Sequence, residues 1–104
     1  MRPSVILVAA ISVAPFAALA QAPDPDLGRN LAASCAMCHG TDGRSAGITE
    51  SLAGRPKDQI VATIKLFREG KKPATIMTQI AKGYTDAQVA AIATYFSEQK
   101  PAGK

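Results

Sequence analysis

The pentapeptide Cys35-Ala36-Met37-Cys38-His39 constrains this chain more than any other feature, because it holds both cysteines and the only histidine. Two cysteines permit one disulfide at most, so the chain cannot be a disulfide-stapled scaffold. A Cys-x-x-Cys pair serves as a dithiol redox pair, as part of a zinc site or, when histidine follows, as an attachment site for a c-type haem. The surrounding sequence has to discriminate among the three.

The flanking sequence favours haem attachment over the two alternatives. A redox pair normally opens a helix after a strand, whereas here a helical pattern precedes the cysteines and no strand is indicated. Tetrahedral zinc takes four Cys or His ligands, and this chain offers three, of which Cys38 and His39 are adjacent. We therefore predict that Cys35 and Cys38 bind one haem c covalently and that His39 is an axial ligand of its iron.

The first twenty residues have the pattern of a secretory signal peptide. Arg2 precedes an uncharged, mostly apolar run from Val5 to Ala18, and Ala18-Leu19-Ala20 supplies small residues at the cleavage positions. The run of about 14 residues is shorter than the ~20 that span a bilayer. We expect cleavage of residues 1–20, with residues 21–104 forming one periplasmic domain that is not stably inserted in a membrane.

The expected mature domain is too small to rely on its own core. A chain of 84 residues buries only about 60% of its unfolded surface. It lacks tryptophan, and few aromatic residues remain. Small domains of this kind usually need a disulfide, a metal or another large buried group, which agrees with a haem at the centre.

The basic residues are in modest excess and are scattered. The mature chain carries a formal charge of +3, without the basic stripe or the interleaved aromatics of a nucleic-acid-binding protein. Six basic residues gather around the second predicted helix and the approach to Met77. They indicate either a docking face for an acidic redox partner or an ordinary solvated surface. These are Lys57, Lys65, Arg68, Lys71, Lys72 and Lys82.

Apolar periodicity predicts an all-α fold. Asp26 is a candidate cap for a first helix that runs into the cysteines, with Leu27, Leu31 and Cys35 on one face. Residues 40–56 are rich in glycine, and a loop of this length is unusual in a small domain unless it wraps a ligand.

Three further helices are expected downstream. One covers Lys57–Glu69, with Ile60, Ile64 and Phe67 on one side, and a short one covers Ala74–Lys82. The last begins after Thr85, because Thr85 and Gln88 form a capping box, and Tyr84 with Val89 fits a hydrophobic staple. Its apolar stripe is Val89, Ile92, Ala93 and Phe96. We expect this last helix to pack against the first.

The second axial ligand can be sought by elimination. The chain has no second histidine, Met1 leaves with the leader, and Met37 lies inside the attachment motif, from which it cannot reach the opposite haem face. Met77 therefore remains as the candidate, 38 residues beyond His39. Otherwise Met77 is an ordinary filler of the core. A neutral thioether ligand favours ferrous iron and raises the reduction potential.

Three stretches carry a resemblance to a known family: CAMCHG, Leu52-Ala53-Gly54, and Pro73 to Phe96. Together the mature chain resembles the single-haem class I cytochromes c of bacterial periplasms. Residues 73–96 are especially similar to the cytochrome subunit of flavocytochrome c sulfide dehydrogenase and related small carriers. The resemblance implies about four helices wrapped around one haem, with the methionine at the position of Met77 as distal ligand.

The resemblance also implies details at single residues. The first and last helices cross near a small residue, and Gly28 and Tyr95 are candidates for that crossing. Alternatively, Gly28 is only a weak point in its helix. Many members place a proline before the Leu-Ala-Gly step, and its carbonyl accepts a hydrogen bond from the axial histidine. This chain reads Ile48-Thr49-Glu50-Ser51 there, so any such bond must use another residue's carbonyl, with a less fixed geometry.

The sequence predicts an electron-transfer protein rather than an enzyme. No catalytic set remains once His39 and the cysteines bind haem, and Arg55 and Tyr84 are candidates for contacts with the haem propionates. The leading hypothesis is a periplasmic carrier that exchanges one electron with a redox donor and an acceptor. The alternative is the haem subunit of a sulfide dehydrogenase that accepts electrons from a flavoprotein. A gas- or peroxide-binding haem would require Met77 to be off the iron.

Overall fold

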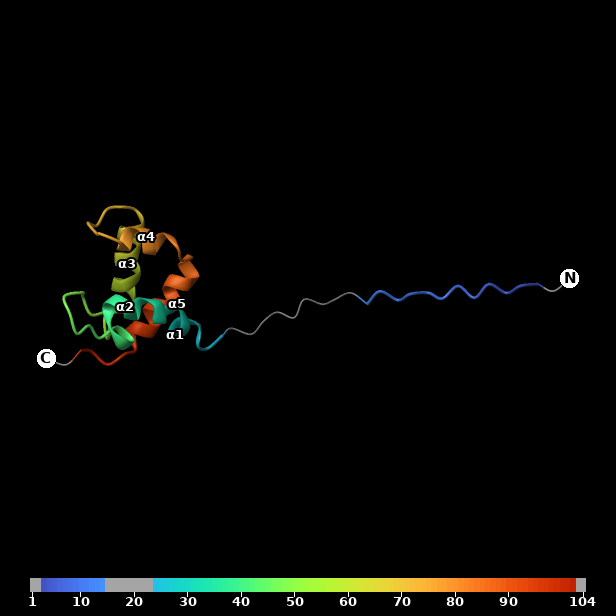
Figure 1. The fold of residues 1–104 in the computed structure, drawn as a ribbon, viewed down its shortest axis with the longest axis horizontal. Coiled ribbons are helices and arrows are strands. Elements are labelled where there is room, and N and C mark those ends of the chain that lie inside the picture. Colours follow the sequence, from blue (N-terminus) through green and yellow to red (C-terminus); the bar gives the residue numbers. More distant parts are fainter. Residues whose placement is uncertain (1–2, 15–23, 103–104) are drawn as a thin grey trace.

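In a computed structural model that describes residues 3–14 and 24–102, every regular element is a helix. Residues 3–14 form an extended, exposed segment that lies away from the helical body (Figure 1). The cleavage position predicted before Gln21 lies outside the described residues. Within those residues, no helix combines the length and apolarity that crossing a bilayer requires.

The first helix is broken into three short pieces around the cysteines. These are α1 (Leu27–Ala32), the 3-10 turn η1 (Ala33–Cys35) and α2 (Ala36–His39). Gly40, at φ 84°, ends the segment. The predicted cap by Asp26 is wrong, because its ψ of 3° is not the extended geometry of a capping residue and its side chain accepts no capping hydrogen bond.

The remaining helices follow the sequence prediction closely. They are α3 (Lys57–Arg68), α4 (Met77–Lys82) and α5 (Asp86–Ser97), and a 3-10 turn, η2 (Thr41–Gly43), lies inside the predicted loop. Helix α4 begins three residues later than predicted, because Ile76, with φ −129°, is not helical. The capping box of α5 is confirmed: Thr85 Oγ1 accepts from the Gln88 amide at 3.1 Å, and Gln88 Oε1 accepts from the Thr85 amide at 2.9 Å.

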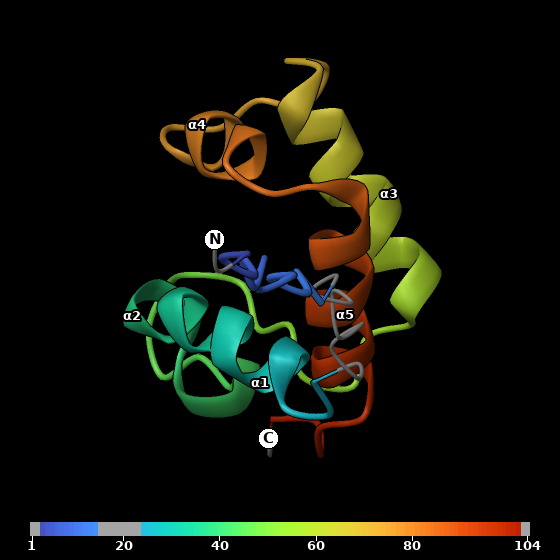
Figure 2. The same cartoon turned by 90° about the vertical axis from the view of Figure 1, so that its right-hand side faces the viewer.

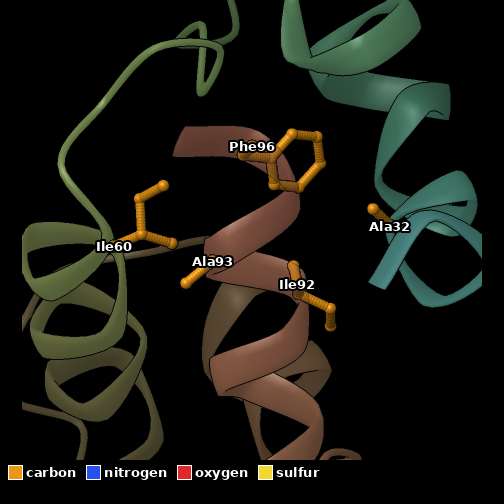
Figure 3. Packing of buried hydrophobic residues seen from close by; sticks show 5 residues of the cluster. All are labelled: Ala32, Ile60, Ile92, Ala93 and Phe96. Atoms are coloured by element: carbon orange, nitrogen blue, oxygen red, sulfur yellow. The ribbon is translucent and has the colours of Figure 1, made fainter. Parts of the chain in front are cut away.

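The core lies along one face of α5. Its predicted stripe is confirmed, since Val89, Ile92, Ala93 and Phe96 are all buried. Figure 3 shows Ile60 of α3 on one side of this stripe and Ala32 of α1 on the other. Helix α5 therefore connects the two parts of the molecule that carry the predicted site residues.

The predicted crossing of the first and last helices is also confirmed. Helix α1 packs against α5, and a Cβ added to Gly28 would lie 2.5 Å from the carbonyl oxygen of Ala91 and 3.3 Å from Tyr95 Cβ. Only glycine allows so close an approach of the two backbones. Of the three residues predicted to share one face, Leu31 and Cys35 pack against the core, whereas Leu27, near the helix start, is 40% exposed.

Candidate functional site

All four predicted site residues line one cavity. Its volume is about 670 Å³, within the usual range of small-molecule sites. Cys35, Cys38 and His39 come from η1 and α2, and Met77 comes from α4. In Figure 2, α2 and α4 lie on the same side of α5, one below the other, and the cavity between them is completed by side chains of α3 and α5.

Both cysteines line the cavity from the same short helical segment. They are three residues apart in a helical segment, which puts them on one face. Both are free, with Cys38 exposed and Cys35 half-buried. Burial raises the pKa of the Cys35 thiol, and a hydrogen bond from Ser34 partly opposes this. The spacing allows both sulfurs to reach one edge of a planar ligand.

His39 is oriented by a backbone carbonyl. Its Nδ1 lies 2.6 Å from the carbonyl oxygen of Glu50. A carbonyl can only accept, so Nδ1 carries the proton and the lone pair of Nε2 is free to bind a metal. The hydrogen bond expected from the family resemblance is therefore present without a proline, and the residue that supplies the carbonyl is Glu50.

Met77 is the first residue of α4, and its neighbours Ile76 and Ile80 line the same cavity. Met37, by contrast, is 91% exposed and points away from the cavity-lining set. The structure thus brings the methionine chosen by elimination close to the cysteine motif and leaves the other one at the surface.

Sequence reasoning missed the role of Arg68. Its guanidinium donates to the carbonyl of Tyr84 at 2.9 Å and to a carboxylate oxygen of Asp86 at 2.6 Å. A third, longer bond of 3.4 Å reaches the carbonyl of Ala81 in α4. Arg68 thereby ties α3 to the end of α4 and the start of α5. Its position on the polar side of an amphipathic helix gave no signal of this role, because two of the three bonds go to backbone carbonyls.

The other basic residues of the predicted face differ in their contacts. Lys71 pairs with Glu69 at 3.1 Å, and Lys72 lies 5.3 Å from the centre of the Phe67 ring. Lys57, Lys65 and Lys82 are exposed. Half of the predicted face is therefore engaged within the molecule.

The two residues considered for the propionates make protein contacts. Tyr84 lies 2.9 Å, hydroxyl to hydroxyl, from Ser34, and it is absent from the residues that line the cavity among those described. Arg55 does line the cavity, and its guanidinium pairs with Glu50 and donates to the carbonyl of Ser51.

The donors and the walls of the cavity fit a haem. Two thiols lie one helical turn apart, an imidazole offers a free Nε2, and a thioether faces the same space from another helix. Apolar side chains supply much of the remaining wall, among them Leu52, Ile60, Ile64, Phe67, Ile92 and Phe96. Across residues 3–14 and 24–102, no three His, Cys, Asp or Glu side chains are grouped so that they could hold a metal ion.

Comparison with known proteins gives a consistent result. Residues 25–100 match the family model described as cytochrome c. The chain is 41% identical over 69 residues to the cytochrome subunit of sulfide dehydrogenase of Chlorobaculum tepidum, covering 66% of this chain and 63% of that protein. It is 36% identical over 83 residues to cytochrome c-554(548) of Halomonas halodenitrificans, covering 76% of this chain and all of that protein.

Among solved structures, a cytochrome c4 of Acidithiobacillus ferrooxidans is similar, with a TM-score of 0.59 and 41% identity over 62% of this chain and 37% of that one. The present chain spans 63% and 35% of the length of the first two curated relatives that it matches.

Proposed function

Because this chain belongs to the cytochrome c family and so carries a covalently bound haem c, we propose that it is a periplasmic one-electron carrier with iron ligated by His39 and Met77. Cys35 and Cys38 form the two thioether bonds. The observation that carries the proposal is that these four residues, which span 43 positions of the sequence, line one cavity. The haem supplies reversible one-electron chemistry between ferric and ferrous iron.

The protein's residues set the properties of that electron transfer. The Glu50 carbonyl fixes the His39 tautomer and makes the imidazole a stronger donor, which favours ferric iron. The Met77 thioether acts in the opposite direction and favours ferrous iron. With both ligands in place in each oxidation state, little has to rearrange when the electron moves. This arrangement suits a carrier and leaves no open position for a substrate.

The test uses the two methionines as a matched pair. Met77→Leu should abolish the weak sulfur-to-iron band of the ferric spectrum. It should also lower the reduction potential by on the order of 0.1 V, a fraction of the ~0.8 V range that axial ligands span. Met37→Leu, at the exposed methionine, should leave both unchanged. A sulfur band that persists in Met77→Leu would exclude Met77 as the ligand.

A second candidate function rests on the similarity to the cytochrome subunit of a sulfide dehydrogenase. In this alternative the chain is the haem subunit that accepts electrons from a flavoprotein, and it has no catalytic residues of its own. Gentle purification from the native source distinguishes the two. Stoichiometric flavin in the purified protein would support the subunit, whereas a haem protein without flavin would support the free carrier with separate redox partners.

Export is part of the same proposal. Residues 1–20 would be a cleaved signal peptide and residues 21–104 the working cytochrome domain. The described part of the leader supports this, because its apolar side chains between Val5 and Val13 are more than 80% exposed and contribute nothing to the core. The mass of the protein isolated from the periplasm should correspond to a chain that starts at Gln21 and carries one haem.

A further inference from the structure

The acceptor of the His39 hydrogen bond lies in a loop that has no helix or strand to hold it. Residues 44–56 contain no regular element, and Glu50 is exposed. The amide of Glu50 makes no hydrogen bond within the described residues. The position of its carbonyl must therefore be set by other contacts, since a hydrogen bond of 2.6 Å tolerates little movement.

Two of those contacts come from one side chain. The guanidinium of Arg55 pairs through Nη2 with the carboxylate of Glu50, and its Nε donates to the carbonyl of Ser51 at 2.7 Å. Arg55 therefore contacts both residues that the Glu50–Ser51 peptide bond joins. We call these two contacts the Arg55 clamp. The planar guanidinium presents its donors in a fixed fork, so the two bonds restrain orientation as well as distance.

The backbone that precedes Arg55 is held by hydrogen bonds to other parts of the domain. Arg55 follows Gly54, whose amide donates to the carbonyl of Phe96 in α5 at 2.9 Å. The amides of Leu52 and Ala53 both donate to the carbonyl of Gly43, at 2.8 and 3.1 Å. The backbone of Arg55 is thus anchored to the core helix, while residues 44–50 are less constrained.

We propose that Arg55 is a positioning residue that holds the Glu50 carbonyl against His39 Nδ1, and that the Arg55–Glu50 pair does here what a proline ring would do by restricting the backbone. The inference rests on the proposed ligation of iron by His39. Through this bond, Arg55 controls how strongly the imidazole donates to the iron, and thereby the reduction potential.

The experiment compares two double variants that keep the net charge. Arg55→Gln/Glu50→Gln removes one positive and one negative charge and abolishes the clamp. Arg55→Gln/Glu50→Pro makes the same charge change but restrains the backbone with a proline, and it removes no hydrogen bond of the Glu50 amide. The comparison therefore separates the restraint on the loop from the charge near the haem.

The readout is exchange of the His39 Nδ1 proton with solvent deuterium in the ferrous holoprotein, followed by NMR. We expect exchange about three- to tenfold faster in Arg55→Gln/Glu50→Gln, the factor that corresponds to the loss of one partly exposed ion pair and one hydrogen bond from a charged donor. In Arg55→Gln/Glu50→Pro the rate should return to within about twofold of the wild-type rate, because proline fixes φ. The potential should rise in the first variant and return towards the wild-type value in the second.

Unchanged exchange and potential in Arg55→Gln/Glu50→Gln would overturn the proposal. So would equally fast exchange in both double variants. Failure of the ligand assignment looks different, because the wild-type His39 resonances would then lack the large haem-induced shifts of an axial imidazole. Both substituted side chains are partly exposed, at 36% for Arg55 and 55% for Glu50, so we expect the variants to fold.

Discussion

His39 and Met77 enter the cavity from two walls that are built differently. The histidine wall, residues 35–56, is joined to α5 by a backbone hydrogen bond from Gly54 to Phe96 and by close packing of Gly43 against Phe96. The methionine wall, residues 69–84, contains the six-residue helix α4, whose start has no side-chain cap. Its end is tied to the rest of the molecule by side-chain hydrogen bonds, from Arg68 to the carbonyls of Ala81 and Tyr84 and between the hydroxyls of Tyr84 and Ser34.

The two walls also differ in how the sequence determines the position of their site residue. His39 follows Cys38 directly, so the proposed attachment at the cysteines would by itself fix its place beside the haem. Met77 is 38 residues away and reaches the cavity only through the packing of α3, α4 and α5. We therefore expect the methionine wall to open at lower free energy than the histidine wall.

The largest expected contrast comes from two glycines with similar positive φ. Gly43 and Gly70 have φ of 80° and 70°. A Cβ at Gly43 would lie 2.7 Å from Phe96 Cδ1, whereas a Cβ at Gly70 meets no atom within 4 Å. Gly43→Ala should lower the free energy of unfolding by about 2–4 kcal/mol, through backbone strain and overpacking together. Gly70→Ala should cost about 1 kcal/mol from strain alone.

Urea denaturation followed by circular dichroism measures both variants against the wild type. Similar costs for the two would show that the walls are equally tight and would remove the basis of the comparison. A larger cost at Gly70 than at Gly43 would mean that the methionine wall is the more tightly packed of the two.

The next effect concerns the link to the methionine wall. Arg68→Gln removes donors from the carbonyls of Tyr84 and Ala81 and should destabilise the wall by about 1–2 kcal/mol; the pair with Asp86, which is 94% exposed, contributes little. With Met77 on the iron as proposed, the sulfur-to-iron band should then disappear at a lower temperature than in the wild type, before the helices unfold.

Lys65→Gln is the matched control, because it makes the same charge change on the same helix at an exposed position. Equal losses of the band in both variants would mean that charge, and not the Arg68 bonds, stabilises α4.

The smallest expected effect concerns the histidine wall and depends on pH. The hydroxyl of Tyr95 in α5 donates to Asp42 in η2, and this hydrogen bond, with burial and the charge of Asp42, raises the pKa of Tyr95 above its usual value near 10. The raised pKa means that the stabilisation is fully present below pH 10 and is lost as the pH rises through the folded-state value.

Tyr95→Phe should therefore cost about 1 kcal/mol at neutral pH. The difference from the wild type should shrink at alkaline pH, when the free energy of unfolding is measured by denaturant titration at several pH values. A constant difference between neutral pH and pH 11 would contradict this account of the hydrogen bond.

The helices were largely predictable, because their signals are local. The Thr85–Gln88 capping box and the stripe from Val89 to Phe96 specify α5 without reference to the rest of the chain. The first helix was predicted less well. A 3-10 turn breaks it at the cysteines, and Asp26 has the wrong backbone geometry to cap it.

At the site, the sequence led to residues that the structure places on one cavity, but it did not lead to the residues that contact them. The cysteine-histidine spacing and the elimination of Met37 led to four residues, all of which line the cavity. The contacts of Glu50, Arg55 and Arg68 involve backbone carbonyls, which every residue carries and no composition reveals. Such contacts depend on how the chain returns on itself, and only the three-dimensional arrangement shows them.

The make-up of the core has a consequence for how the protein matures. Half of the buried apolar residues in the described ranges are alanines, and Phe96 is the only large side chain among those that are almost fully enclosed. A chain without haem has too little apolar surface to compact around the 670 Å³ cavity. We therefore expect thioether formation to precede folding, so that a chain that misses its haem stays open to proteases and is removed before it can compete for redox partners.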